Sequence, residues 1–160
     1  MSERPARPAH EDILWLGDYL PYRLGVVASR MLREAAQVYK RRADPVTTPQ
    51  FRTLAILANH EPLTATEICR LSMLHKVAIS RALSQLQRRG LVMRSKILDD
   101  RRASHVTLTA QGWRYYTAIV PEMKRQEEAL RRAVSPQDLK RLFRMLEQFD
   151  EFHRTNACTP

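Results

Sequence analysis

Basic side chains gather in one short stretch of this 160-residue chain, between residues 75 and 102. The whole chain carries 27 Lys and Arg against 17 Asp and Glu, a net charge of +10, and this stretch alone holds eight of the cations against two aspartates. Guanidinium and ammonium groups bind phosphate oxygens, and Arg can also hydrogen-bond a guanine edge through two N–H groups. The clustering therefore indicates a polyanionic partner.

Half of these cations fall on a predicted helix at residues 75–89. Its apolar positions recur on one face, at Ile79, Ala82, Leu83 and Leu86. The opposite face is small, hydroxylic or cationic, and it supplies the candidate DNA-binding residues Lys76, Ala78, Ser80, Arg81, Ser84 and Gln85. Arg81 suits a guanine edge and Gln85 an adenine edge. The alternative is an ordinary solvated helix face.

After Gly90, at the expected left-handed C-cap of this helix, the apolar period changes from 3.6 to 2. Residues 91–97 and 105–108 alternate like two strands, which predicts a two-stranded ribbon with a charged tip. Its basic and acidic side chains are further candidates for DNA binding: Arg94, Lys96, Asp100, Arg101 and Arg102. A solvated hairpin tip is the competing interpretation.

Two helices precede the basic helix, and the second of them is short. One starts at a threonine cap before Pro49 and stops before Pro62; in the next, Thr64 and Glu67 have the spacing of a capping box. A turn at residues 72–74 separates it from the basic helix. Helix, short helix, turn, longer helix and ribbon is the order of a winged helix-turn-helix, which places a helix in the major groove of DNA.

Further helices flank this unit. We expect a short one within residues 11–19, a long one over 21–42 that begins at Pro21, and one after residue 109 that Pro121 kinks or breaks. A last helix opens with Ser135 as its cap. The apolar faces of residues 21–42 and 110–154 are too extensive for one small domain to cover, which favours a second copy of the chain over an intramolecular helical cap.

Composition argues against several other classes of protein. The chain is 44% hydrophobic with only 4 Gly, which is typical of a helix-rich globular protein. No apolar run approaches the roughly 20 residues of a membrane span, and the first residues lack a signal-peptide core, so we expect a soluble cytoplasmic protein without membrane contact. A phosphate-binding Gly-rich loop, G-x-S-x-G and paired carboxylates in a predicted pocket are absent, so no enzyme is predicted.

Neither the cysteines nor the histidines have metal-ligand spacing. Cys69 and Cys158 lie far apart without a CxxC, and the five histidines form no HExxH. No metal site and no cofactor is therefore expected. Cys69 lies among apolar residues of a predicted helix, where a packed thiol is the first interpretation and a redox sensor the alternative.

The stretch LTATEICRLSMLHKVAISRALSQLQRRGLVMRS, followed by DDRRASHVTLTAQG, resembles the MarR family of winged-helix transcriptional regulators. The family pattern D-R-R-A-x-x-V-x-L-T-x-x-G is matched by Asp100, Arg101, Arg102, Ala103, Val106, Leu108, Thr109 and Gly112, and the resemblance extends over roughly residues 20 to 150. Two positions depart from it. His75 replaces an Asp that a close subgroup uses as a helix cap, and Ala78 replaces a hydroxyl residue that contacts DNA, so the operator sequence does not follow from the resemblance.

The resemblance implies a two-fold dimer whose reading helices lie about 34–36 Å apart on a pseudo-palindromic operator. It implies that Arg102 enters the minor groove, whose negative potential attracts Arg, with Asp100 orienting it and Arg101 on a phosphate. Most members are repressors that release DNA when a small, often aromatic or acidic effector binds. The residues expected to line an effector site are Trp15, Tyr19, Tyr22, Arg23, Val26, Arg30, Trp113 and Tyr116.

The expected fold is thus mainly α with a small β wing (α+β), a winged helix-turn-helix flanked by N- and C-terminal dimerisation helices. Its expected parts are a disordered tail (1–9), N-terminal dimerisation helices (10–45), the DNA-binding unit (46–109), C-terminal dimerisation helices (110–154) and a tail (155–160). The predicted function is a homodimeric, effector-responsive repressor. A redox-responsive regulator acting through Cys69 and a non-specific basic nucleic-acid-binding protein remain as alternatives.

Overall fold

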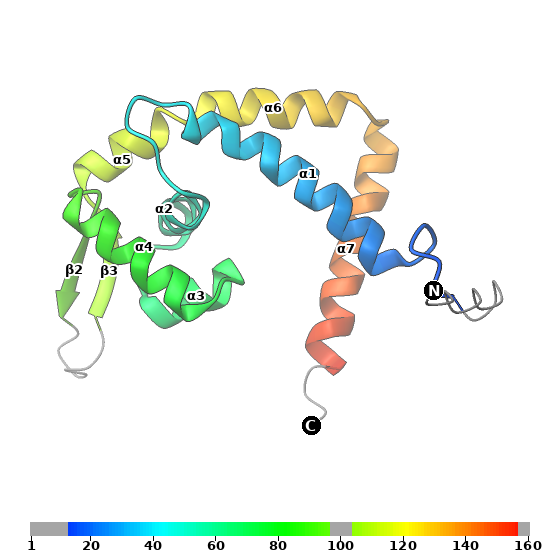
Figure 1. Ribbon diagram of the computed structural model, residues 1–160, viewed down its shortest axis with the longest axis horizontal. Helices are drawn as coiled ribbons and strands as arrows, with labels where there is room; N and C mark the ends of the chain where they lie inside the picture. Colours follow the sequence, from blue (N-terminus) through cyan, green and yellow to red (C-terminus); the bar gives the residue numbers. More distant parts are fainter. Residues whose placement is uncertain (1–12, 97–103, 157–160) are drawn as a thin grey trace, which may run out of the picture. The chain divides into compact units, whose positions relative to one another are not determined.

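The computed structural model describes residues 13–96 and 104–156, and it divides the chain into two compact units between Pro45 and Val46. The fold is mainly helical with a small antiparallel sheet, as the sequence predicts (Figure 1). The expected tail at 1–9 and the tip of the ribbon, with Asp99, Asp100, Arg101 and Arg102, lie outside the described residues.

The N-terminal unit contains one long helix, α1 (Leu20–Lys40), with Pro21 in its first turn. The short helix predicted within residues 11–19 is wrong: residues 13–19 form a turn in which the N–H groups of Asp18 and Tyr19 both bond the Trp15 carbonyl, at 3.0 and 3.1 Å. Pro21 has no N–H with which to continue a preceding helix, and Gly17 weakens any helix there.

The second unit opens with α2 (Thr48–His60), the two-residue strand β1 (Leu63–Thr64) and α3 (Ala65–Ser72). The cap of α2 is Thr47, which forms a full capping box with Gln50. The predicted capping box of α3 is confirmed, with Thr64 Oγ1 accepting from Glu67 N at 3.3 Å and Glu67 Oε2 accepting from Thr64 N at 2.7 Å. The hydrogen bond from the backbone N–H of Thr64 lowers the pKa of the Glu67 carboxyl.

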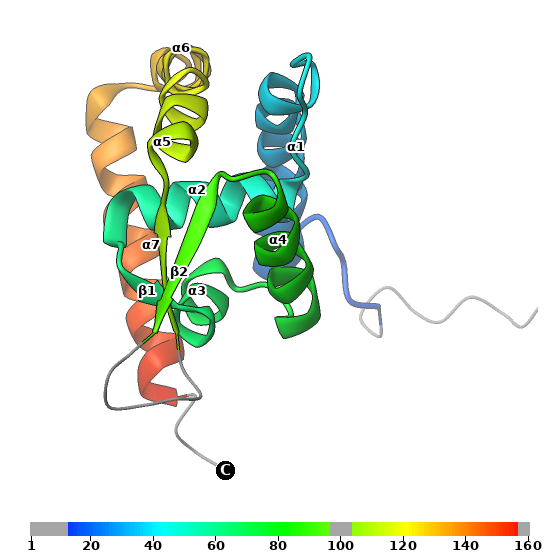
Figure 2. The same cartoon turned by 90° about the vertical axis from the view of Figure 1, so that its left-hand side faces the viewer.

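The basic helix is α4 (Lys76–Arg88), and Gly90 follows it with φ +66°, the left-handed conformation predicted for its C-terminus. Strands β2 (Val92–Lys96) and β3 (Ser104–Leu108) then pair antiparallel from Val92↔Leu108 to Lys96↔Ser104. The predicted two-stranded ribbon is wrong in one respect, because β1 adds a third strand in the order β1-β3-β2 (Figure 2). Two residues of β1 pair with Val106 and His105, a long-range contact with no local sequence signal.

The helices and the sheet of this unit share one core. Fully buried apolar side chains come from α2, α3, α4, the corner before β2 and strand β3, among them Leu54, Leu57, Ile68, Ile79, Leu83, Leu86, Leu91 and Val106. Burial of this apolar area is the main contribution that holds α4 and the ribbon in place. The core therefore fixes which face of α4 is left to solvent.

Three helices follow the ribbon: α5 (Ala110–Thr117), α6 (Val120–Arg132) and α7 (Pro136–Asn156). Pro121 lies in the first turn of α6, so the predicted kink or break is a break. Ser135 caps α7 as predicted, its Oγ accepting from Asp138 N at 3.1 Å. Neither α6 nor α7 contains a buried residue. In contrast, Gly112 near the start of α5 and Ile119 just after its end are buried.

Gly112 anchors α5 against the corner between α4 and β2. A Cβ added at Gly112 would lie 1.9 Å from the Leu91 carbonyl oxygen, so no other residue fits without movement. Thr109 reinforces the same corner, since its N–H donates to Leu91 O at 3.1 Å and its Oγ1 donates to Gly90 O at 2.6 Å. This close approach explains why the wing pattern ends in glycine.

Candidate nucleic-acid interface

Helix α4 presents one apolar and one polar face, as its sequence predicts. Ile79, Ala82, Leu83 and Leu86 are buried, which confirms the predicted core face. Of the predicted DNA-binding residues on this helix, those with exposed side chains are Lys76, Ser80, Arg81, Ser84 and Gln85. Ala78 is only half-buried, and its methyl group is the smallest of the set. These exposed cationic, hydroxyl and amide groups are the kinds that a helix in the major groove uses to bind phosphates and base edges.

Val77 is an exposed member of this face that sequence reasoning missed. Its side chain is 52% exposed, and it lies four residues before Arg81 and seven before Ser84, on the same helical stripe. Because a valine in a helix is ordinarily assigned to the core, the residue types alone did not indicate Val77 as a candidate for DNA contact. The spacing alone could have found it, because an exposed apolar group at this place can contact a thymine methyl.

Gln85 is held by α2. Its Oε1 accepts a hydrogen bond from Gln50 Nε2 at 2.8 Å, and Gln50 is itself buried at the start of α2 as part of the capping box. The bond uses the acceptor of the Gln85 amide and leaves its NH2 group as a donor. The Gln85 NH2 group can therefore donate to an acceptor on a base or a phosphate, while the bond from Gln50 restrains the orientation of the amide.

The turn before α4 is built by side chains that are not candidates for DNA contact. Met73 adopts φ 53°, Arg52 Nη1 donates to the Ser72 carbonyl at 3.0 Å, and Ser72 Oγ accepts from Leu74 N at 3.2 Å. At the N-cap of α4, His75 makes no side-chain capping bond, as its departure from the family pattern predicts. The first N–H groups of α4 therefore stay available to an anion such as a phosphate.

The cations around α4 differ from those of the C-terminal helices. Within the described residues, no carboxylate lies within 4 Å of the charged groups of Arg70, Lys76, Arg81, Arg88, Arg94 and Lys96. On α6 and α7, by contrast, Arg125, Arg131, Arg132, Arg141 and Arg154 each pair with an acid three or four residues earlier. Cations without a carboxylate partner are free to neutralise phosphates and to release counterions from DNA.

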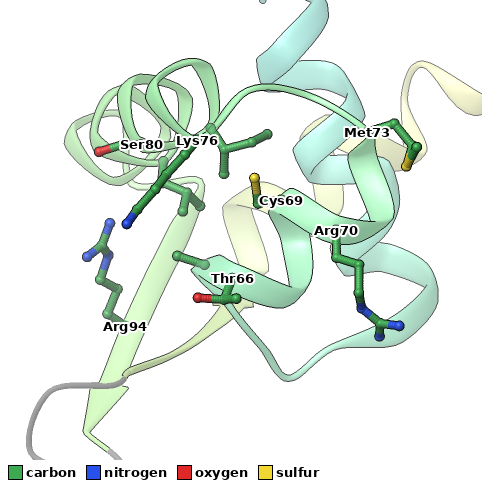
Figure 3. Close-up of a pocket in the computed structure, with 10 residues that line it drawn as sticks. Thr66, Cys69, Arg70, Met73, Lys76, Ser80 and Arg94 are labelled. Carbon is green, nitrogen blue, oxygen red and sulfur yellow. The ribbon is translucent and has the colours of Figure 1, made fainter. Parts of the chain in front are cut away.

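The first wing strand brings two more of the predicted residues beside α4. Arg94 and Lys96 are both exposed on β2, and Arg94 lines a hollow of about 540 Å³ together with Lys76 and Ser80 of α4 and with Cys69 and Arg70 of α3 (Figure 3). Helix α4 and strand β2 thus present one continuous basic surface. The other predicted residues of the ribbon, namely Arg102 for the minor groove, Asp100 to orient it and Arg101 for a phosphate, lie outside the described residues.

Three of the predicted effector residues line one hollow on α1. Tyr22, Val26 and Arg30 share it with Gly25, Ser29 and Arg33, and its volume is about 540 Å³. Sequence reasoning missed Ser29 and Arg33, although their spacing of three and seven residues from Val26 puts them on the same face. The remaining predicted residues of this unit, Trp15, Tyr19 and Arg23, are exposed and do not line it.

Trp113 and Tyr116, the other predicted effector residues, lie on α5 and are engaged in packing. Their rings meet edge to face at 6.4 Å, and Tyr116 stacks on Phe51 of α2 at 6.3 Å. The indole N–H of Trp113 donates to Glu61 Oε1 at 3.1 Å, so its polar group already has a partner. This contact joins α5 to the end of α2.

The remaining sites of possible chemistry are sparse. The Cys69 thiol is half-buried and donates to the Leu74 carbonyl at 3.1 Å. Among residues 13–96 and 104–156, no group of three His, Cys, Asp or Glu side chains could hold a metal ion. In the same part of the chain, no helix combines the length and apolar character needed to cross a bilayer.

Comparisons with known proteins agree with this geometry. The MarR family model matches residues 46–104. The HTH-type transcriptional repressor NicR of Pseudomonas putida is 31% identical over 110 residues, which cover 65% of this chain and 70% of NicR. The homoprotocatechuate degradative operon repressor of Escherichia coli is 24% identical over 126 residues, 77% of this chain and 85% of that protein.

The similarity to solved structures extends beyond the residues that the family model matches. A MarR family transcriptional regulator from Silicibacter pomeroyi superimposes with a TM-score of 0.74 at 26% identity, covering 89% of this chain and 94% of that one. Family model, repressor sequences and fold thus agree on one family. The chain belongs to the MarR family of transcriptional regulators.

Proposed function

We propose that this regulator is a homodimeric repressor that binds a pseudo-palindromic operator and releases it when a small aromatic acid binds. The observation that carries the proposal is the α4 surface, where Lys76, Arg81 and Arg94 face solvent without a carboxylate partner in the described chain. A cationic helix face held rigidly by a buried core is suited to the major groove.

In this proposal the residues have distinct roles. Arg81 reads a guanine edge, Ser84 and Val77 contact neighbouring bases, and Lys76 and Arg94 bind phosphates. Arg102, at the sequence-predicted tip of the wing, enters the minor groove. Phosphate contacts supply affinity and salt dependence, whereas the Arg81 and Val77 contacts supply preference for one sequence.

The dimer is proposed from the helix faces that no part of the described chain buries. Helix α7 exposes a row of large apolar side chains, namely Leu142, Phe143, Met145, Leu146, Phe149 and Phe152. On α1 the exposed row is Leu20, Leu24, Val27 and Met31. Rows of this length are too apolar to face water, and packing against a second copy would bury them. Residues 10–45 and 110–154 are accordingly proposed as dimerisation segments, and residues 46–109 as the DNA-binding unit.

The effector class is proposed from α1. Its hollow combines an aromatic ring from Tyr22, an apolar wall from Val26 and guanidinium groups from Arg30 and Arg33, a set that fits a hydroxylated aromatic carboxylate. The Escherichia coli relative is named for the operon that degrades homoprotocatechuate, an aromatic acid, which supports the same class. Redox control through Cys69 is the second candidate, since that thiol lines the hollow beside α4.

The test is a binding titration of the purified protein against its own upstream intergenic DNA and a scrambled duplex, at two salt concentrations. We expect a preference of at least about 10³-fold for the native DNA and an affinity that falls steeply with salt. Equal affinity for both duplexes would contradict the operator-specific proposal and favour the non-specific alternative. Light scattering on the same sample should give twice the mass of one chain; a monomer at micromolar concentration would contradict the dimer.

A further inference from the structure

One carboxylate ties three segments of the DNA-binding unit together. Glu61 follows α2, and its Oε2 accepts the backbone N–H of Leu108 at the end of β3, at 2.6 Å. Its Oε1 accepts the indole N–H of Trp113 on α5, at 3.1 Å. The two oxygens of one side chain therefore join the end of α2, the base of the wing and the start of α5.

The partners of Glu61 are themselves fixed. Trp113 packs edge to face on Tyr116, which stacks on Phe51 of α2, so these ring contacts restrain the indole. Leu108 is buried and pairs with Val92 of β2. Hydrogen bonds to an ionised acceptor are about twice as strong as those between neutral groups, so this pair is a strong local restraint.

The two hydrogen bonds of Glu61 lie at the base of the wing, the ribbon formed by β2 and β3. The strands β2 and β3 run five residues from Leu108 and Val92 to Lys96 and Ser104, and a small change of angle at their base becomes a large displacement at their far end. The other side of the base is held by Gly90 and Thr109, at the corner with α4. On the β3 side, Glu61 holds the Leu108 amide at the base, and β1 pairs with Val106 and His105 further along the strand.

We propose that Glu61 is a positioning residue for the wing: it touches no DNA, and by holding the Leu108 amide against Trp113 it sets the direction in which the wing meets the minor groove. The inference rests on the proposed function, because it requires the wing to bind DNA. It gives Trp113 a role in DNA binding, where the sequence suggested only an effector contact.

The test compares operator affinity in two sets of double variants. Glu61→Gln keeps the shape of the side chain but removes one of its two acceptors, and we expect it to weaken operator binding roughly tenfold. Combined with Arg102→Ala, it should cause no further loss beyond about twofold, because both changes remove the same wing contact. Combined with Arg81→Ala on α4, the fold-losses of operator affinity of the two single variants should multiply, because the Arg81 contact does not depend on the wing.

Control variants separate positioning from general damage. Asn59→Ala changes an exposed side chain at the end of α2, two residues before Glu61 and outside both the proposed DNA-binding surface and the dimerisation segments, and it should leave affinity unchanged. Trp113→Phe removes the indole donor and keeps an aromatic ring, although a smaller one, and it should repeat the Glu61→Gln pattern if that variant does not fold. Circular dichroism melting identifies the folded variants.

Losses from Glu61→Gln that multiply with those of both Arg102→Ala and Arg81→Ala would overturn the inference, since a merely structural role acts on both contacts alike. An unchanged affinity in Glu61→Gln and Trp113→Phe would also overturn it. Failure of this inference can be distinguished from failure of the proposed function. If Arg102→Ala and Arg81→Ala each leave operator affinity unchanged, the proposed DNA-binding surface is itself wrong, and the inference falls with it.

Discussion

Replacing Gly112 by alanine tests the corner that joins α4, the wing and α5. The added Cβ would lie 1.9 Å from the Leu91 carbonyl oxygen and 3.0 Å from the Leu91 carbonyl carbon. Since Cβ atoms essentially never come closer than 3.0 Å to another atom, the two backbones must separate by about 1.1 Å. Backbone of the core corner, rather than a flexible side chain, has to move.

The expected cost follows from what that movement disrupts. Forcing an extra carbon into a packed site costs about 1–3 kcal/mol. The Leu91 oxygen also accepts the Thr109 N–H at 3.1 Å, and losing that hydrogen bond adds about 1 kcal/mol. We therefore expect Gly112→Ala to lower the free energy of unfolding by about 3 kcal/mol, a large part of the stability of an ordinary domain.

The assay is urea unfolding followed by circular dichroism, at one protein concentration for all variants because association would add to stability. Gly25→Ala is the matched control. Gly25 lies within α1, and no atom lies within 4 Å of the Cβ that alanine would add, so this change should stabilise the helix by about 0.5–1 kcal/mol. A Gly112→Ala protein within about 1 kcal/mol of the wild type would refute the reasoning from the close contact.

Three further predictions concern DNA binding, acid stability and redox control. Arg81→Ala should cost roughly 1–3 kcal/mol of operator binding and relax preference at one base pair, as measured by titration against single-base operator variants; uniform weakening across sequences would instead make Arg81 a phosphate contact. The bond from Thr64 lowers the pKa of Glu67, so the ionised carboxylate stabilises the fold above its unfolded pKa near 4.5, and this contribution is lost as the pH falls through the lower folded value. The stability difference between wild type and Glu67→Gln in urea titrations should therefore shrink below about pH 4.5, and a constant difference would rule out the charged cap. Cys69→Ser should keep effector-induced release of operator DNA in a gel-shift assay, whereas loss of release would favour redox control.

Much of the DNA-binding unit follows from local sequence. The capping box of Thr64 and Glu67, the left-handed Gly90 and the buried stripe of α4 all agree with expectation, because each depends on residues within one or two turns of one another. The solvent-facing side of α4 was predictable for the same reason. Once the apolar stripe of α4 is buried in the core, the side chains on its opposite face are left in solvent.

Tertiary structure decided what local spacing cannot encode. Strand β1 has two residues and exists only because Val106 and His105 pair with it. The engagement of Trp113 by Glu61 depends on groups 52 positions apart in the chain. The sequence by itself determined the helices of the DNA-binding unit, where they are capped and which face of α4 is cationic, since these depend on neighbouring residues. Only the folded chain decided which distant backbones meet at the base of the wing, because such contacts arise when separate elements bury their apolar faces in one core.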